Sequence, residues 1–158
     1  MRIGVLSDTH LYQVTQELVD IYNIYLSDVD MIIHAGDIVS SSIVDFLEKG
    51  VFHGVQGNMD PLEIKALLPE KKIVDVGNFS LGIVHGWGPA SGLEERILPL
   101  FPKVDVIIYG HSHIASNHEK NGVLFFNPGT ATGYSASGVN SIGILEVTET
   151  VKGHIIPV

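Results

Sequence analysis

Side chains that bind metals or transfer protons follow five short apolar runs of this sequence. The clusters are Asp8-Thr9-His10, Gly36-Asp37, Gly57-Asn58-Met59-Asp60, His85-Gly86 and Gly110-His111-Ser112-His113. In sheets with parallel strands, ligands gather beyond the carboxyl ends of the strands. If the apolar runs are parallel strands, side chains that span a hundred residues of sequence therefore meet at one place.

The residue types and their spacing indicate a metal centre. Asp8 and His10 are two residues apart, as are His111 and His113, and residues at this spacing in an extended segment share one face. Together the clusters offer carboxylates, four histidines and a carboxamide, which is too many ligands for one metal ion and suits two. Nitrogen and oxygen donors without sulfur favour manganese, iron, zinc, nickel or cobalt. A carboxylate that bridges two cations holds them roughly 3.5–4 Å apart.

The segments that must position these clusters alternate between predicted strands and helices. Continuous Val/Ile/Leu runs predict buried strands over residues 2–6, 30–33, 51–55, 79–84 and 104–109. Apolar spacings of three and four predict helices over 13–26, 40–48, 61–67 and 91–100. Thr15 and either Ser40 or Ser41 are the expected N-caps. The alternation favours βαβ units and a largely parallel sheet through the first two-thirds of the chain.

The last third of the chain has a different pattern. Short strands are predicted over residues 113–118, 123–127, 141–147 and 151–156, and Lys120-Asn121-Gly122 indicates a hairpin between the first two. These strands favour a second, antiparallel sheet packed on the first, with helices outside. No linker or repeat divides the 158 residues, so we expect one domain over residues 1–158.

Composition excludes several classes of function. Lys and Arg number 9 against 18 Asp and Glu, a formal charge of −9, which argues against a partner held by phosphate-backbone charge, such as duplex DNA. The absence of cysteine excludes disulfides, thiolate catalysis and Cys-ligated zinc. No apolar run reaches the ~18 residues of a membrane span, and Asp8 interrupts the first run before a signal-peptide core could form. We therefore expect a soluble cytoplasmic protein with no membrane partner.

The five clusters, taken in order, resemble the motif set of the calcineurin-like metallophosphoesterases. Their spacing is most similar to that of the small YfcE-type phosphodiesterases of bacteria and archaea. The resemblance covers nearly the whole chain, including Asn127-Pro128-Gly129-Thr130 after the last histidine motif. It implies an α/β fold in which two packed mixed β-sheets are flanked by helices, a four-layer sandwich.

The resemblance also implies a role for each residue. One metal ion would be held by Asp8, His10, Asp37 and His113. The other would be held by Asp37, Asn58, His85 and His111, so that Asp37 bridges the two. A hydroxide shared by both metals would attack the phosphorus of a small phosphodiester in line, with Asn58, Asp37 and His85 as the catalytic residues. The implied cofactors are two divalent transition metal ions, manganese first, with nickel, zinc, iron and cobalt as alternatives.

One position departs from the family pattern. Many members carry a His directly after the motif Asn, and this His protonates the leaving alcohol. Here the residue is Met59, which has no proton to give. Poor alkoxide leaving groups are therefore expected to react slowly, which favours diester over monoester hydrolysis. The sequence allows two alternative roles for each of two further residues. Asp60 is either a proton donor or a support for its loop, and Trp87 is either a stacking surface for the substrate or a packing residue.

Two other functions stay open. One is a phosphomonoesterase. The other is a non-catalytic scaffold, as in the retromer subunit that shares this fold, which Met59 and a mean hydropathy of +0.28 favour because apolar surface can serve a partner or a homo-oligomer. The complete ligand set argues against the scaffold. His34 is expected to be a hydrogen-bonded core residue, and no Lys or Arg lies within the clusters, so substrate phosphate is expected to meet metals and backbone N–H groups.

Overall fold

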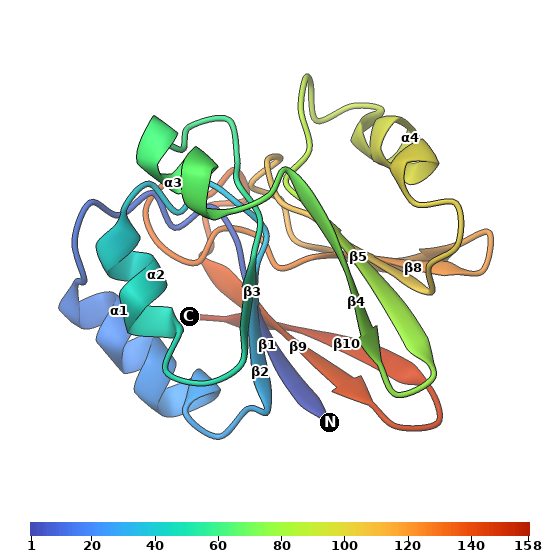
Figure 1. Ribbon diagram of the computed structural model, residues 1–158, viewed down its shortest axis with the longest axis horizontal. Coiled ribbons are helices and arrows are strands. Elements are labelled where there is room, and N and C mark those ends of the chain that lie inside the picture. The colour runs from blue at the N-terminus through green and yellow to red at the C-terminus, as the bar shows by residue number, and fades with distance from the viewer.

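Two mixed five-stranded sheets form the centre of the computed structural model, which describes residues 1–158. The first sheet has the order β10-β9-β1-β2-β3, with β10 Val151–Pro157, β9 Ser141–Val147, β1 Arg2–Leu6, β2 Met31–His34 and β3 Phe52–Gly54. The second has the order β4-β5-β6-β8-β7, with β4 Lys71–Val76, β5 Phe79–Val84, β6 Val106–Ile108, β8 Val123–Asn127 and β7 Ser116–Lys120. The sheets pack against each other with helices outside (Figure 1).

Strand direction brings the predicted clusters to one edge of the sandwich. Strands β1, β2 and β3 run parallel in the first sheet, and β5, β6 and β8 run parallel in the second. The loops that follow these strands gather at the upper edge in Figure 1, opposite the N-terminus. This edge is where ligands collect in sheets with parallel strands.

The core between the sheets is apolar and closely packed. Ile33 of the first sheet and Leu81 and Ile108 of the second belong to one buried cluster, and Phe126 fills the space near β9 and β10. A Cβ added at Gly153 would lie 2.6 Å from Phe126 Cε2, so a glycine is needed where this ring meets the neighbouring sheet. Full burial of such a ring stabilises the fold by roughly 1.5–3 kcal/mol.

Helices cover the outer faces of both sheets. The first sheet carries α1 Gln16–Ile21, the π-helix η1 Tyr22–Leu26, α2 Ser41–Leu47 and α3 Leu62–Leu67, whose apolar residues share a second buried cluster with Leu6 and Ile32. The second sheet carries α4 Leu93–Ile97 and the 3₁₀ turn η2 Leu98–Leu100. The predicted caps are confirmed, because Thr15 Oγ1 accepts from the Leu18 N–H at 3.3 Å and Ser40 Oγ accepts from the Ser42 N–H at 3.3 Å. None of the helices is both long and apolar enough to cross a bilayer.

The predicted division of strands between the sheets is wrong. The chain's first three strands and its last two share one sheet, and β5 and β6 belong to the other. Six of the seven residues of β9 are buried, and such a strand gains most beside the central strand β1, with which it pairs antiparallel. Apolar runs predict buried strands, but they do not say which distant strand is the partner.

Two strands of the second sheet, β4 and β7, differ from the strands predicted from the sequence. β4 is an edge strand of the second sheet and alternates exposed and buried residues. It begins with two lysines, so it lacks the continuous apolar run by which the other strands are predicted. The predicted hairpin at Lys120-Asn121-Gly122 is confirmed, since β7 and β8 pair antiparallel and Asn121 and Gly122 take φ values of 54° and 76°. β7 begins at Ser116 rather than at residue 113, because His113 has a left-handed backbone with φ 54°.

Candidate metal centre

The predicted ligands lie in loops that follow β1, β2, β3, β5 and β6. Backbone hydrogen bonds join these loops: Asp8 N–H donates to Gly36 O at 3.0 Å, His10 N–H to Asp37 O at 3.1 Å, and Gly110 N–H to His85 O at 3.1 Å. The loops after β1, β2, β5 and β6 are therefore each positioned by a neighbouring loop as well as by their own strands.

Left-handed backbone conformations are concentrated in these loops. Seven non-glycine residues have positive φ, and five of them are predicted ligands: Asp8, His10, Asp37, His111 and His113. Such conformations are uncommon outside glycine. They persist where the surrounding structure holds them, and they cluster at functional sites.

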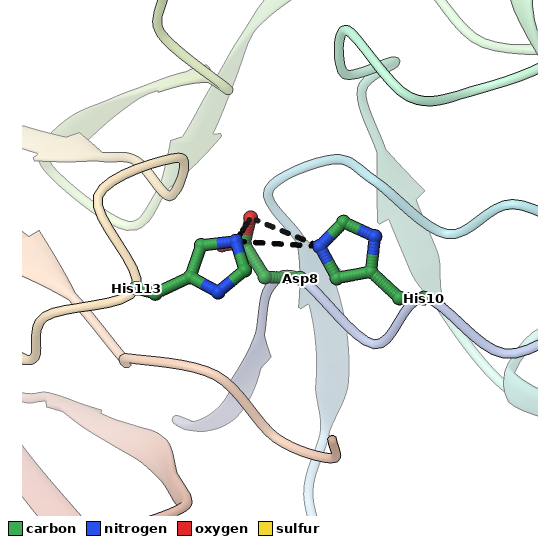
Figure 2. A group of neighbouring side chains, drawn as sticks. All are labelled: Asp8, His10 and His113. Carbon is green, nitrogen blue, oxygen red and sulfur yellow. Dashed lines mark hydrogen bonds and ion pairs between the residues drawn. The ribbon is translucent and has the colours of Figure 1, made fainter. Parts of the chain in front are cut away.

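The first group of side chains comprises Asp8, His10 and His113, whose polar ends face one another (Figure 2). His113 Nε2 lies 3.2 Å from Asp8 Oδ1, and His10 Nε2 lies 3.8 Å from the same oxygen and 3.3 Å from His113 Nε2. Asp8 is fully buried, yet its Oδ1 has no aligned hydrogen-bond donor. A buried oxygen surrounded by imidazole nitrogens is what a cation site requires of its ligands.

The second group comprises Asp8, Asp37 and His85. Asp37 Oδ2 lies 3.2 Å from His85 Nε2 and 3.7 Å from His10 Nε2, so this carboxylate stands between the two groups. Asn58 extends the second group, because its Oδ1 lies 3.1 Å from His85 Nε2 and 2.9 Å from His111 Nδ1. All seven predicted ligands are thus brought together.

Three of the histidines are fixed in one tautomer. His85 Nδ1 contacts Ala35 O at 2.8 Å, His111 Nε2 contacts Gly88 O at 2.7 Å, and His113 Nδ1 contacts Tyr134 O at 2.9 Å. A carbonyl oxygen only accepts, so each of these outward nitrogens must carry the proton. When a ring is neutral, its inward nitrogen therefore presents a lone pair to the centre, which is how metal-binding histidines are oriented.

The electrostatics of the site keep its carboxylates charged. Burial acts to raise the pKa of Asp8, but His113, His85 and the Ser7 hydroxyl hold that pKa below its ordinary value. Burial likewise opposes ionisation of Asp37, whose pKa is lowered by His85 and the Met59 N–H. The Asp8 carboxylate raises the pKa of His113 to about 9. Divalent cations that take these positions must therefore displace protons, so their binding strengthens as pH rises.

Two buried side chains support the loops from below. His34 Nδ1 accepts from the Gly36 N–H at 3.2 Å, so its protonated Nε2 donates to Thr9 Oγ1 at 3.2 Å. This confirms that His34 is a hydrogen-bonded core residue. Asp60 accepts three backbone N–H groups, from Asp37 at 3.2 Å, Gly57 at 2.7 Å and Val39 at 2.6 Å. These contacts make Asp60 a support for its loop.

Two lysines near the metal centre were not predicted from the sequence. Lys65 and Lys71 line a cavity that also touches Asn58, His85 and Trp87. They lie on α3 and β4, outside the five clusters, and the place of Lys71 depends on the pairing of β4 with β5.

Comparison with known proteins identifies the class. The family model described as the calcineurin-like phosphoesterase superfamily domain matches residues 1–150. A protein of Methanocaldococcus jannaschii named as a probable metallophosphoesterase is 35% identical over 100% of this chain and 82% of its own length. A phosphodiesterase of the same organism is 30% identical over 99% of both chains.

Solved structures agree with this fold. An archaeal phosphodiesterase superposes with a TM-score of 0.76 at 27% identity and covers 100% of both chains. Vps29 of Entamoeba histolytica, solved in complex with Zn²⁺, gives a TM-score of 0.71 at 27% identity over 99% of both chains. The fold and the site define a phosphoester hydrolase of the metal-dependent kind. The chain belongs to the calcineurin-like phosphoesterase superfamily, and its expected arrangement of two mixed sheets flanked by helices is confirmed.

Substituting Gly57 with Ala is expected to weaken metal binding without unfolding the protein. A Cβ at this position would overlap the Asp37 carboxylate and lie 2.5 Å from the Asp37 backbone nitrogen, so Asp37 must move. We expect at least a tenfold loss of Mn²⁺ affinity by calorimetry on chelator-treated protein, with an unchanged circular dichroism spectrum. Gly50→Ala is the control, because its added Cβ meets nothing within 4 Å. Equal Mn²⁺ affinity in the two variants would contradict the placement of Asp37.

His34 is expected to make the folded state less stable in acid. Burial lowers the pKa of His34 from 6.5 to about 3. Between these values the unfolded chain binds a proton that the folded chain does not, so stability falls as pH drops, by about 2 kcal/mol at pH 5. Urea unfolding of chelator-treated protein at pH 7 and pH 5 measures this loss. His34→Gln should remove that part of the pH dependence and the exposed control His154→Gln should keep it; identical slopes in all three proteins would show that His34 is not buried and neutral.

Proposed function

We propose that this protein hydrolyses a small phosphodiester with the help of two divalent transition metal ions. The observation that carries the proposal is the Asp8 Oδ1 atom, buried without an aligned hydrogen-bond donor and faced by histidine nitrogens at 3.2 to 3.9 Å. Donors of this kind suit manganese, which we expect first, and also nickel, zinc, iron and cobalt.

The two groups of side chains supply one site for each cation. The first site would use Asp8, His10, Asp37 and His113. The second site would use Asp37, Asn58, His85 and His111. The position of Asp37 Oδ2 between His10 and His85 supports its role as the shared ligand. When bound, the cations lower the pKa of water and neutralise charge on the phosphoryl oxygens.

Asn58 has a second task in this proposal. Its Oδ1 faces His85 and His111, so its amide nitrogen points away from both rings. That N–H group has no acceptor in the protein and is exposed at the rim of the centre. It is therefore available to donate to a phosphoryl oxygen and to orient the diester.

The surroundings favour a diester with a good leaving group. Met59 is 62% exposed beside the centre and has no proton to donate to a departing alkoxide. Asp60 is buried and accepts three backbone N–H groups, so it does not replace the missing acid. A monoester is more highly charged than a diester, and its alkoxide would also leave without a proton donor. This arrangement therefore suits a phosphomonoesterase less well.

The comparison with solved structures adds an observation in favour of the scaffold alternative, the likeness to Vps29. One Vps29 structure contains Zn²⁺, so metal binding alone does not separate a scaffold from an enzyme. The oriented histidines and the free Asn58 amide support catalysis. A charge of −9 supports a small substrate over duplex nucleic acid. We propose no membrane partner and leave homo-oligomerisation open.

Substituting Asp37 with Asn should abolish turnover of bis(p-nitrophenyl) phosphate. The carboxamide retains the shape of the side chain but removes its negative charge and replaces one of its two oxygens with an NH₂ group. With saturating Mn²⁺, kcat is expected to fall at least a hundredfold, an effect of about 3 kcal/mol on the barrier. Asp45→Asn on the exposed face of α2 should match the wild type. Turnover by Asp37→Asn close to that of the control would refute the shared-ligand role.

Substituting Met59 with His should raise monoester hydrolysis. An imidazole at this position can protonate the leaving alcohol, and such proton transfer contributes about 10²–10⁴-fold where it operates. We expect at least a tenfold gain in kcat for phenyl phosphate relative to bis(p-nitrophenyl) phosphate. Met59→Leu controls for the change of side chain, since the Met59 N–H that donates to Asp37 Oδ1 at 2.8 Å is kept in both. No gain over the leucine variant would place the limit on monoesters elsewhere.

A further inference from the structure

A cavity of about 450 Å³ opens directly beside the metal centre. Asn58 and His85 belong to its wall, and so do Trp87, Lys65 and Lys71. Its volume lies within the range of roughly 300–1,000 Å³ that is usual for small-molecule sites. A diester held at Asn58 would therefore extend one of its two substituents into this space.

We propose that the cavity selects a nucleotide diester that carries an additional phosphate group. In this arrangement the base stacks on Trp87, and the additional phosphate binds Lys65 and Lys71. The proposal names a substrate class for the hydrolase described above and depends on that function.

The two lysines are a local exception in an acidic protein. Neither forms an ion pair with a carboxylate, and Lys71 Nζ makes only two long contacts, to Leu100 O at 3.5 Å and to the Phe101 ring centroid at 6.0 Å. Glu70 is the one acidic side chain on the cavity wall apart from the metal centre. The wall therefore carries a net positive charge in a chain of formal charge −9, which suits an anionic substituent.

The backbone holds both lysines next to the centre. Lys71 pairs in register with Val84, the residue before His85, so strand pairing fixes its distance from that histidine. Gln56 anchors the connection between α3 and β4, because its N–H donates to Pro69 O at 2.9 Å and its Nε2 donates to Leu68 O at 3.0 Å. Lys65 and Lys71 flank this anchored connection.

Trp87 stands on a loop that is held from two sides. Arg96 Nε donates to Trp87 O at 3.0 Å, and its Nη1 donates to Ser91 O at 2.9 Å. His111 Nε2 donates to Gly88 O on the other side at 2.7 Å. Trp87 is nonetheless 46% exposed, so its indole is a large aromatic surface on an anchored backbone and is not part of the core. Stacking of a base on such a ring is worth about 1–3 kcal/mol.

Two substrates that differ by one phosphate test the proposal. Thymidine 5′-(p-nitrophenyl phosphate) and its 3′-phosphorylated derivative share the scissile bond and the leaving group. With Mn²⁺, we expect kcat/KM to be at least tenfold higher for the 3′-phosphorylated compound. The double variant Lys65→Gln/Lys71→Gln should lose this preference through KM, with the unphosphorylated compound unaffected. Lys103→Gln/Lys152→Gln, exposed and away from the cavity, should keep the preference.

A third substrate tests the aromatic wall. Methyl p-nitrophenyl phosphate has the same leaving group and no base. Trp87→Leu should lower kcat/KM at least fivefold for both thymidine compounds and leave the methyl ester unchanged. If all three diesters are hydrolysed but the preference is absent, or survives in the cavity-lysine variant, the proposal is wrong while the hydrolase function stands.

Calorimetry separates this proposal from the function on which it rests. Metal-loaded protein should bind thymidine 3′,5′-bisphosphate at least tenfold more tightly than thymidine 5′-monophosphate, and the cavity-lysine variant should bind both equally. Lysine-dependent binding without turnover of any diester would refute the hydrolase function and keep the binding site. Equal affinity of the wild type for both nucleotides would refute the binding site.

Discussion

The structure depends on one constraint: a fully buried carboxylate oxygen, Asp8 Oδ1, has no aligned hydrogen-bond donor and is faced by histidine nitrogens instead. An unsatisfied buried polar atom costs about 1–3 kcal/mol, and a charged one costs more. The fold nevertheless directs three histidine nitrogens toward this atom, one from its own loop and two from other loops. Cations bound here would satisfy this oxygen and the surrounding histidine nitrogens together.

The remaining polar contacts of the site keep its donors aimed inward. Outward N–H groups of His85, His111 and His113 are held by backbone carbonyls. Asn127 Nδ2 donates to Gly110 O at 2.9 Å and so supports the loop that carries the last two of these histidines. Rigid support of this kind reduces the reorganisation needed when ligands bind, and it also maintains the left-handed backbone at Asp8 and Asp37.

Much of the site could be predicted from the sequence, because its ligands follow apolar runs and strand ends converge wherever strands are parallel. Asp8 after β1 and His85 after β5 meet even though these strands belong to different sheets. The sheet assignment could not be predicted, since the partner of β9 is chosen by packing over more than a hundred residues. For the same reason the position of Lys71 near His85 could not be predicted, because it results from the pairing of β4 with β5.

The absence of basic residues from the five clusters is compensated from outside them. Lys65 and Lys71 reach the cavity beside Asn58, while the centre itself contains only carboxylate, amide and imidazole groups. In the proposed function, binding of substrate charge and activation of the scissile bond would therefore use adjacent groups of residues. Met59 lies exposed at the rim of the centre, where it offers neither charge nor a proton.

Anomalous diffraction from crystals soaked in Mn²⁺ tests the central claim most directly. The account predicts two peaks, one among Asp8, His10 and His113 and the other among Asn58, His85 and His111, with the Asp37 carboxylate touching both. A single peak, or manganese bound away from these side chains while Asp8 Oδ1 stays unpartnered, would contradict it.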